Sequence, residues 1–236
     1  RGFGATVNPG AWAGVATYAH DAVHAARAIK RRHPNLPLYL LGASMGGAVA
    51  ILAARKLEPT ILDGIILAAP AIWARETMPW YQRLALWIGA HFFPGVTVTG
   101  RGLDITPSDN KKMLIQLGRD PLVIKETRID TIYGLVNLMD EALMATSELK
   151  KPALILYGEK DEVIPKKPTA EMLRRFSKGI YRFAFYANGY HMVLRDIQGA
   201  EVWNDINAWV RDRNSPLPSK ADRYGLKALG LTKPEQ

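Results

Sequence analysis

The sequence predicts an α/β fold in which a mostly parallel sheet is flanked by helices and interrupted by a helical cap insertion. Two observations predict it. Short apolar runs of strand length alternate with segments of helical length, a rhythm typical of right-handed β-α-β crossovers. The second and third apolar runs are separated by roughly 80 residues, far more than a strand-to-helix connection needs, so an inserted unit is expected there.

Four apolar runs are expected to form the strands. They cover residues 36–41, 62–68, 153–157 and 181–186. The first three are nearly continuous in apolar residues, as in strands that are covered on both faces. Helices are expected over residues 12–32, where apolar residues recur at helical spacing, and over 43–57. Pro34 ends the first of these, because the residue before a proline is disfavoured in the helical conformation.

The insertion divides the chain into parts. We expect the core over residues 1–71 and 151–213, a helical cap over 72–150, and an irregular tail over 214–236. Aromatic residues crowd the first third of the insertion, and residues 135–144 have the pattern of a further helix. The tail begins with a run of Asn, Ser and Pro residues, which are typical of irregular structure.

Composition excludes several kinds of chemistry. The 236 residues contain no cysteine, so a disulfide, a thiolate nucleophile and a Cys-ligated zinc site are all excluded. The net charge of +9 is typical of a solvated protein surface, and a basic surface also attracts anionic lipid. Specific nucleic-acid binding is not expected, because the basic residues do not alternate with aromatic ones. No apolar run reaches the roughly 18–20 residues that cross a bilayer, so we expect a cytoplasmic or peripheral membrane protein.

The pentapeptide Gly42-Ala43-Ser44-Met45-Gly46 has the pattern of a nucleophile elbow, with a predicted strand before it and a helix of small residues after it. We expect glycine two residues before and after the serine because so tight a turn leaves no room for a Cβ. Ser44 is the candidate nucleophile, and the Met45 N–H is the candidate oxyanion donor. A glycine-rich turn without chemistry is the alternative. A phosphate loop is excluded because no Lys-Ser or Lys-Thr follows.

A serine hydroxyl needs a base, and His191 is the candidate. It follows the last predicted strand, on a loop expected at the same sheet edge as Ser44. The other histidines are expected on the solvated surface, or in packing for the one in the insertion; they are His20, His24, His33 and His91. Asp161, in the turn after the third strand, is the candidate acid that orients the imidazole. Glu159 and Glu162 are its neighbouring alternatives.

The sequence resembles the monoacylglycerol lipase and lysophospholipase branch of the α/β-hydrolase family. The resemblance rests on residues 33–54, 158–165 and 186–196, and the order nucleophile, acid, histidine is also that of α/β-hydrolases. It implies an α/β-hydrolase fold, a triad of Ser44, Asp161 and His191, and the Met45 amide as the second oxyanion donor. It also implies esters of a single long acyl chain as substrates. No cofactor and no metal are expected.

Two departures from the family pattern stand out. Members commonly have a histidine directly before the nucleophile, where this chain has Ala43. The family also has several strands before the point that corresponds to Arg1, and the loop that supplies the first oxyanion donor lies among them. N-terminal strands are therefore expected to be missing from this chain.

The leading hypothesis is a serine hydrolase that cleaves monoacylglycerols or lysophospholipids through an acyl-serine intermediate. A general carboxylesterase, a thioesterase or an acyltransferase would use the same three residues. A catalytically inert binding or membrane-associated module is the alternative from another class. The expected partners are a small lipid or ester substrate and, peripherally, a membrane surface.

Overall fold

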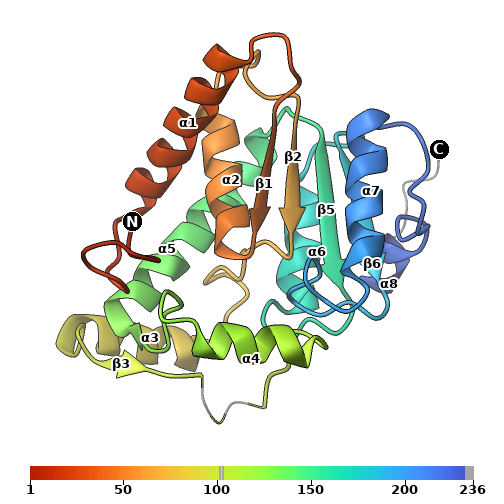
Figure 1. Cartoon of the computed structure of the whole chain (residues 1–236). Coiled ribbons are helices and arrows are strands. Elements are labelled where there is room, and N and C mark those ends of the chain that lie inside the picture. Colours follow the sequence, from red (N-terminus) through yellow and green to blue (C-terminus); the bar gives the residue numbers. More distant parts are fainter. Residues whose placement is uncertain (101, 103, 232–236) are drawn as a thin grey trace.

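A computed structural model describes residues 1–100, 102 and 104–231. Four strands form a parallel sheet in the order β1-β2-β5-β6 (Figure 1); they are β1 (Tyr39–Ala43), β2 (Gly64–Ala68), β5 (Ala153–Gly158) and β6 (Tyr181–Tyr186). All four predicted strands are therefore present. The first begins at Tyr39 rather than at Leu36, because Pro37 has no N–H to donate to a neighbouring strand.

Helices flank the sheet and form much of the insertion. They are α1 (Val15–Arg32), α2 (Met45–Lys56), α3 (Trp80–Phe92), α4 (Lys111–Arg119), α5 (Ile129–Ala145), a 3-10 turn (Thr146–Glu148), α6 (Lys166–Arg175), α7 (Gly199–Arg211) and α8 (Gly225–Ala228). The helix expected over 135–144 is the second half of α5. In the insertion, β3 (Thr97–Val98) pairs antiparallel with β4 (Thr127–Arg128). Within the described residues, none of the helices is both long and apolar enough to cross a membrane.

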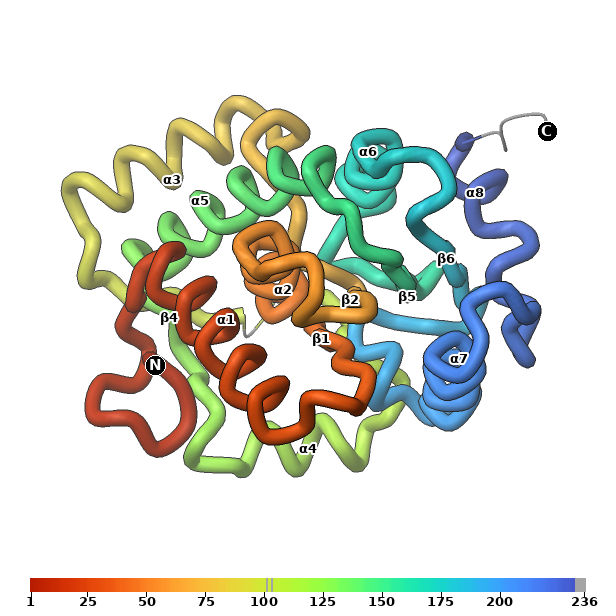
Figure 2. The backbone as a smooth tube through the Cα atoms, turned by 90° about the horizontal axis from the view of Figure 1, so that it is seen from above, coloured from red at the N-terminus to blue at the C-terminus, as the bar shows by residue number. Residues whose placement is uncertain are grey.

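Alternate residues of the strands enter two separate cores, one on each face of the sheet. Ile65, Leu67 and Ile155 belong to a core that includes residues of α1, α2, α5 and α6. Ile66 and Leu154 belong to the other core, which α7 covers. Figure 2 shows α2 and α6 on one side of the sheet and α7 on the opposite side. The alternation arises because successive side chains of a strand point to opposite faces.

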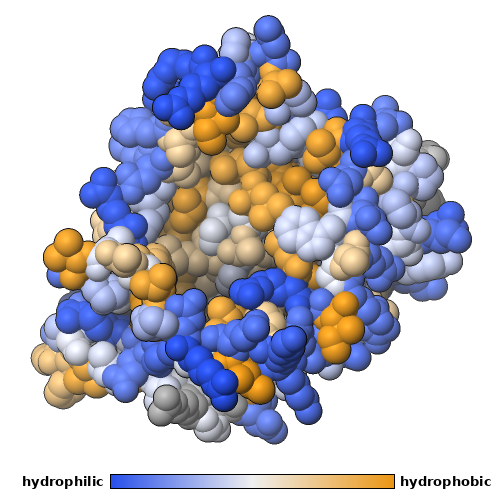
Figure 3. Space-filling model, viewed as in Figure 1, coloured by the Kyte–Doolittle hydropathy of each residue, from blue (hydrophilic) through white to orange (hydrophobic). Residues whose placement is uncertain are grey.

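β1 is the edge strand that ends directly before Ser44. Among the described residues it pairs only with β2, so its other edge has no strand partner. Leu41 and Ala43 lie on the same face of the sheet as α7, but α7 does not cover them. Leu41 is 39% exposed, and Ala43 is exposed too. Figure 3 shows apolar residues gathered in a hollow over this part of the sheet.

The segment after α7 packs against the sheet. The Phe185 N–H of β6 donates to the Ala221 carbonyl (2.9 Å), and Leu217 is buried in the core under α7. The predicted irregular tail thus includes α8 and contacts β6, and its last residues, 232–236, lie outside the described residues. The second half of α5 likewise shares its core with α2. The boundaries proposed for core, cap and tail stay a prediction.

Candidate active site

Ser44 lies at the sharp turn between β1 and α2. Its backbone has φ 49° and ψ −120°, a strained conformation for a residue with a Cβ. The loop after β2 holds this turn in place. The Ser44 N–H donates to the Ala68 carbonyl (3.0 Å), and the Ser44 carbonyl accepts from the Ala71 N–H (2.8 Å) and the Gly47 N–H (2.9 Å). The hydroxyl is therefore presented at the carboxyl end of the sheet.

Two glycines beside Ser44 are required by space, and only one of them was expected. A Cβ on Gly42 would lie 2.2 Å from the Gly46 carbonyl oxygen, as predicted for so tight a turn. A Cβ on Gly46 would meet no atom within 4 Å, so the predicted lack of room at this position is wrong. The crowding is instead at Gly47, where a Cβ would lie 2.7 Å from the Pro70 Cβ. Gly46 contributes its carbonyl to the crowding of Gly42, and its own Cβ position is open.

The structure brings Ser44, His191 and Asp161 together. His191 Nε2 lies 3.0 Å from Ser44 Oγ, and His191 Nδ1 lies 2.9 Å from Asp161 Oδ2. The Asp161 side chain is fully buried and that of His191 is 10% exposed. With Nδ1–H donating to the carboxylate, Nε2 is left as an acceptor for the Ser44 hydroxyl proton, which is the arrangement that general-base activation of a serine requires.

Backbone amides fix the orientation of Asp161. Its Oδ1 accepts from the N–H groups of Val163 (2.8 Å) and Ile164 (2.9 Å), so its Oδ2 is left for the imidazole. The alternative acids make other contacts. Glu159 pairs with Lys166, and Glu162 accepts from the Thr106 N–H.

Met45 is the first residue of α2, so its amide has no acceptor within the helix. The amide directly follows Ser44 at a helix N-terminus, where negative charge is stabilised. This is the position expected for an oxyanion donor.

Comparison with known proteins adds a family to this geometry. A family model described as serine aminopeptidase, S33, matches residues 1–198. The chain belongs to the serine aminopeptidase S33 family. It is 27% identical to the monoglyceride lipase of Mus musculus over 201 residues, which are 83% of this chain and 65% of the mouse protein. This S33 family chain thus spans slightly less than two thirds of that curated relative.

Two solved structures with the same fold are monoacylglycerol lipases by title. The soluble variant of Saccharomyces cerevisiae monoglyceride lipase, in complex with a substrate analogue, has a TM-score of 0.73, with 21% identity over 90% of this chain and 75% of the other. The Paleococcus ferrophilus monoacylglycerol lipase has a TM-score of 0.71, with 21% identity over 89% and 79%. The α/β-hydrolase fold and the resemblance to the monoacylglycerol lipase branch are therefore confirmed for this S33 family chain.

The remaining histidines of this S33 family chain lie away from Ser44. His20, His24 and His33 are exposed on or after α1. His91 is exposed on α3, where its ring stacks on Trp87 (centroids 4.5 Å apart). In residues 1–100, 102 and 104–231, no three His, Asp or Glu side chains are grouped so that they could hold a metal ion.

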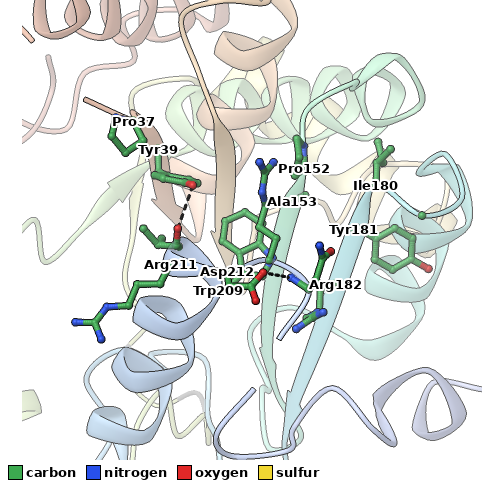
Figure 4. A pocket seen from close by; sticks show the side chains of 14 residues that line it. Pro37, Tyr39, Pro152, Ala153, Ile180, Tyr181, Arg182, Trp209, Arg211 and Asp212 are labelled. Carbon is green, nitrogen blue, oxygen red and sulfur yellow. Dashed lines mark hydrogen bonds between the residues drawn. The ribbon is translucent and has the colours of Figure 1, made fainter. Parts of the chain in front are cut away.

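An apolar cavity of about 390 Å³ lies beside the elbow. It is bounded by the N-terminal segment, by Met45 and by the insertion; its lining includes Trp12, Tyr18, Met45, Leu122, Ile124 and Leu135. A larger cavity of about 650 Å³ lies at the opposite, amino ends of the strands (Figure 4). Two of its arginines are engaged with the protein itself, since Arg182 donates to the Ser215 carbonyl and Arg213 to the Asp63 carbonyl. The cavity lined by Met45 is the smaller of the two.

Sequence reasoning missed Ser108 and Asp196, two buried polar residues near His191. Ser108 Oγ donates to Asp196 Oδ1 (2.5 Å) across 88 residues of sequence. Asp196 follows His191 by five residues, and an acidic residue on a loop is ordinarily a solvated one. Only the tertiary structure brings it under the insertion.

Proposed function

We propose that this chain contains the reaction centre of a serine ester hydrolase that cleaves lipids with a single acyl chain, a monoacylglycerol or a lysophospholipid. The observation that carries the proposal is the aligned series Ser44 Oγ, His191 Nε2, His191 Nδ1 and Asp161 Oδ2, with contacts of 3.0 Å and 2.9 Å. The similarity to monoglyceride lipases supports the lipid part of the proposal.

In the acylation step, His191 Nε2 takes the Ser44 proton while Ser44 Oγ attacks the ester carbonyl. The tetrahedral oxyanion accepts a hydrogen bond from the Met45 N–H. The imidazolium, stabilised by Asp161, then donates its proton to the leaving alkoxide, and glycerol or the glycerophospho head group departs. In the second step His191 takes a proton from water, the resulting hydroxide adds to the acyl carbonyl, and the fatty acid leaves as Ser44 regains its proton.

The cavity beside Met45 supports an apolar acyl group. Most of its lining is apolar, and the lining includes Met45, the residue that directly follows Ser44. Apolar pockets of a few hundred Å³ are typical of small-molecule sites. We propose that the acyl chain lies between Trp12 of the N-terminal segment and the Leu122–Ile124 stretch of the insertion.

Helix α3 supports contact with a membrane surface. Every residue of α3 is described and none is buried, so its aromatic and aliphatic side chains are at least partly accessible to solvent. The exposed ones on or directly after the helix are Trp80 (73% exposed), Tyr81, Leu84, Trp87, Ile88, Phe92 (67%) and Phe93. Exposed apolar patches mark interaction surfaces, and the net charge of +9 adds attraction to anionic lipid.

Vesicle binding tests the membrane contact. The double variant Trp80→Ser/Phe92→Ser is expected no longer to co-sediment with vesicles of anionic phospholipid. Tyr224→Ser serves as a matched control, because Tyr224 is a 72% exposed aromatic residue outside the insertion. Equal binding by both variants would rule out α3 as the contact.

Covalent labelling tests the enzymatic proposal. The full-length protein is expected to react with a fluorophosphonate probe, whereas Ser44→Ala is expected to give no labelling and His191→Ala a loss of acylation with the fold retained. His24→Ala removes an exposed histidine and should label like wild type. If Ser44→Ala labels as well as wild type, an inert binding module becomes the better description. Product analysis with long-chain glycerol esters, acyl-CoA and alcohol acceptors separates a lipase from a thioesterase or an acyltransferase.

A further inference from the structure

The segment 106–110, which precedes α4, lies across the two loops that carry Asp161 and His191. It joins the Asp161 loop through one hydrogen bond, from the Thr106 N–H to Glu162 Oε2 (2.7 Å). It joins the His191 loop through several more; these are Met192 N–H to the Pro107 carbonyl (2.9 Å), Ser108 Oγ to Asp196 Oδ1 (2.5 Å), Asn110 Nδ2 to the Arg195 carbonyl (2.9 Å) and Ile197 N–H to Asp109 Oδ1 (2.8 Å). The insertion and both loops are therefore one hydrogen-bonded unit.

Asp196 is the buried centre of this unit. Its Oδ1 accepts from the Ser108 hydroxyl, and its Oδ2 accepts from the Tyr190 N–H (2.8 Å). Asp196 is 7% exposed and Ser108 is 1% exposed. Burial raises the pKa of Asp196, and the hydrogen bonds from Ser108 and Tyr190 oppose that rise. Burying a carboxylate costs free energy that hydrogen bonds to its oxygens offset, as the bonds from Ser108 and Tyr190 do here. The proposed chemistry does not use this carboxylate.

The carboxylate acts on the backbone directly before His191. Tyr190 is the preceding residue, and the Asp196 N–H donates to the Met192 carbonyl (3.1 Å), so residues 190–196 close into a compact loop around His191. We infer that Asp196 is a positioning residue that, together with Ser108, locks the His191 loop to the insertion and so sets His191 Nε2 against Ser44 Oγ. The inference rests on the proposed function.

The expected effect follows from the geometry. The Nε2 to Oγ contact is 3.0 Å, and a misplacement of about 1 Å costs on the order of 10²-fold in rate. Losing Asp196 leaves the Tyr190 N–H and the Ser108 hydroxyl without their acceptor, so the backbone next to His191 loses a restraint that the other three hydrogen bonds to segment 106–110 do not replace. The apolar cavity has no contact with Ser108 or Asp196 among its lining residues, so substrate affinity is expected to change little.

The chain offers a matched control for stability. Asp205 is also buried, and it also accepts from a serine hydroxyl and a backbone N–H, both of Ser219, as well as from the Tyr186 hydroxyl. It lies in α7 and has no hydrogen bond to the segment 106–110 or to the His191 loop among the described residues. Asp205→Ala and Ser219→Ala therefore remove the same chemistry away from the reacting groups.

The test compares Asp196→Ala and Ser108→Ala with Asp205→Ala and Ser219→Ala in the full-length protein, using a short-chain p-nitrophenyl ester. We expect Asp196→Ala to lower kcat about 10- to 100-fold with KM within about twofold. Ser108→Ala should also lower kcat with little change in KM, but by a smaller factor. Asp196→Asn keeps an acceptor for the Tyr190 N–H and should therefore recover most of kcat. The two control variants should lower the melting temperature and keep kcat within about twofold.

Two results would overturn the inference. One is a kcat of Asp196→Ala within twofold of wild type, and the other is an equal loss of kcat in Asp205→Ala at equal melting temperature. If Asp196→Ala does not fold, Ser108→Ala against Ser219→Ala decides the question by the same criterion. If Ser44→Ala turns over the ester as fast as wild type, the proposed function itself fails, which is a different outcome from a wild-type Asp196→Ala beside an inactive Ser44→Ala.

Discussion

Replacing Asp161 with asparagine tests the hydrogen bonds that orient His191. The wild-type carboxylate has two separate tasks, since Oδ1 accepts from the Val163 and Ile164 amides and Oδ2 accepts from His191 Nδ1. An asparagine is almost the same size and can keep only one of these tasks unchanged. Either its oxygen stays with the two amides and its NH₂ faces His191, or the reverse holds.

The two orientations differ clearly in free energy. With NH₂ facing the amides, two buried N–H donors lose their acceptor, and each such loss costs about 1–3 kcal/mol. With the oxygen kept on the amides, NH₂ donates to His191 Nδ1 and every group is paired, provided that the imidazole moves its proton to Nε2. The orientation that keeps the oxygen on the Val163 and Ile164 amides is therefore favoured by about 2–6 kcal/mol. It turns Nε2 into a donor toward Ser44, so it abolishes general-base activation.

We expect Asp161→Asn to lower kcat by about 10⁴, equivalent to about 5.5 kcal/mol of activation free energy, while the melting temperature changes little. Burst kinetics with a p-nitrophenyl ester measure the acylation rate. Glu159→Gln is the control, because Glu159 is an acid of the same loop that contacts Lys166 instead of His191. A variant that keeps kcat within tenfold of wild type would refute this account of the Asp161–His191 contact.

Three further predictions concern stability, each measured by chemical denaturation. Gly47→Ala should lower the free energy of unfolding by about 1–3 kcal/mol, because its Cβ would lie 2.7 Å from the Pro70 Cβ. Gly46→Ala, where the Cβ position is open, should leave the free energy of unfolding unchanged or raise it by up to about 1 kcal/mol. The reverse ranking of the two variants would contradict the packing. Because burial raises the pKa of Asp196, its contribution to stability is present at low pH and is lost as pH rises through the folded-state pKa. Relative to wild type, Asp196→Asn should therefore gain stability from about pH 4 to about pH 7, and a constant difference would show that the pKa is not raised. Leu154→Ala, at a fully buried position, should cost about 2–5 kcal/mol, and a loss under 1 kcal/mol would contradict its burial.

The sheet and the three candidate residues could be predicted because their signals are local. Each strand is a short apolar run between helical segments, and the parallel topology follows from that alternation. Ser44, Asp161 and His191 each lie in the turn or loop that follows such a run, so they share the carboxyl edge of the sheet. That placement depends only on the order of elements along the chain. It does not require knowledge of contacts between residues that are distant in the sequence.

The parts that were missed depend on contacts between distant residues. The space at Gly46 and the crowding at Gly47 are set by where the Pro70 loop lies, and the sequence around the serine does not specify that loop. The bond between Ser108 and Asp196 joins an irregular segment of the insertion to the His191 loop. Neither residue belongs to a periodic element, so no pattern of spacing indicates that they meet.

The strand that ends directly before Ser44 is also the strand whose outer edge is unpaired among the described residues. An unpaired edge exposes a row of backbone donors and acceptors that a further strand can occupy. Ser44 immediately follows the last residue of β1, so a strand bound there would restrain backbone only one or two residues from the Ser44 hydroxyl. A strand at this edge would therefore also make the backbone turn at Ser44 more rigid.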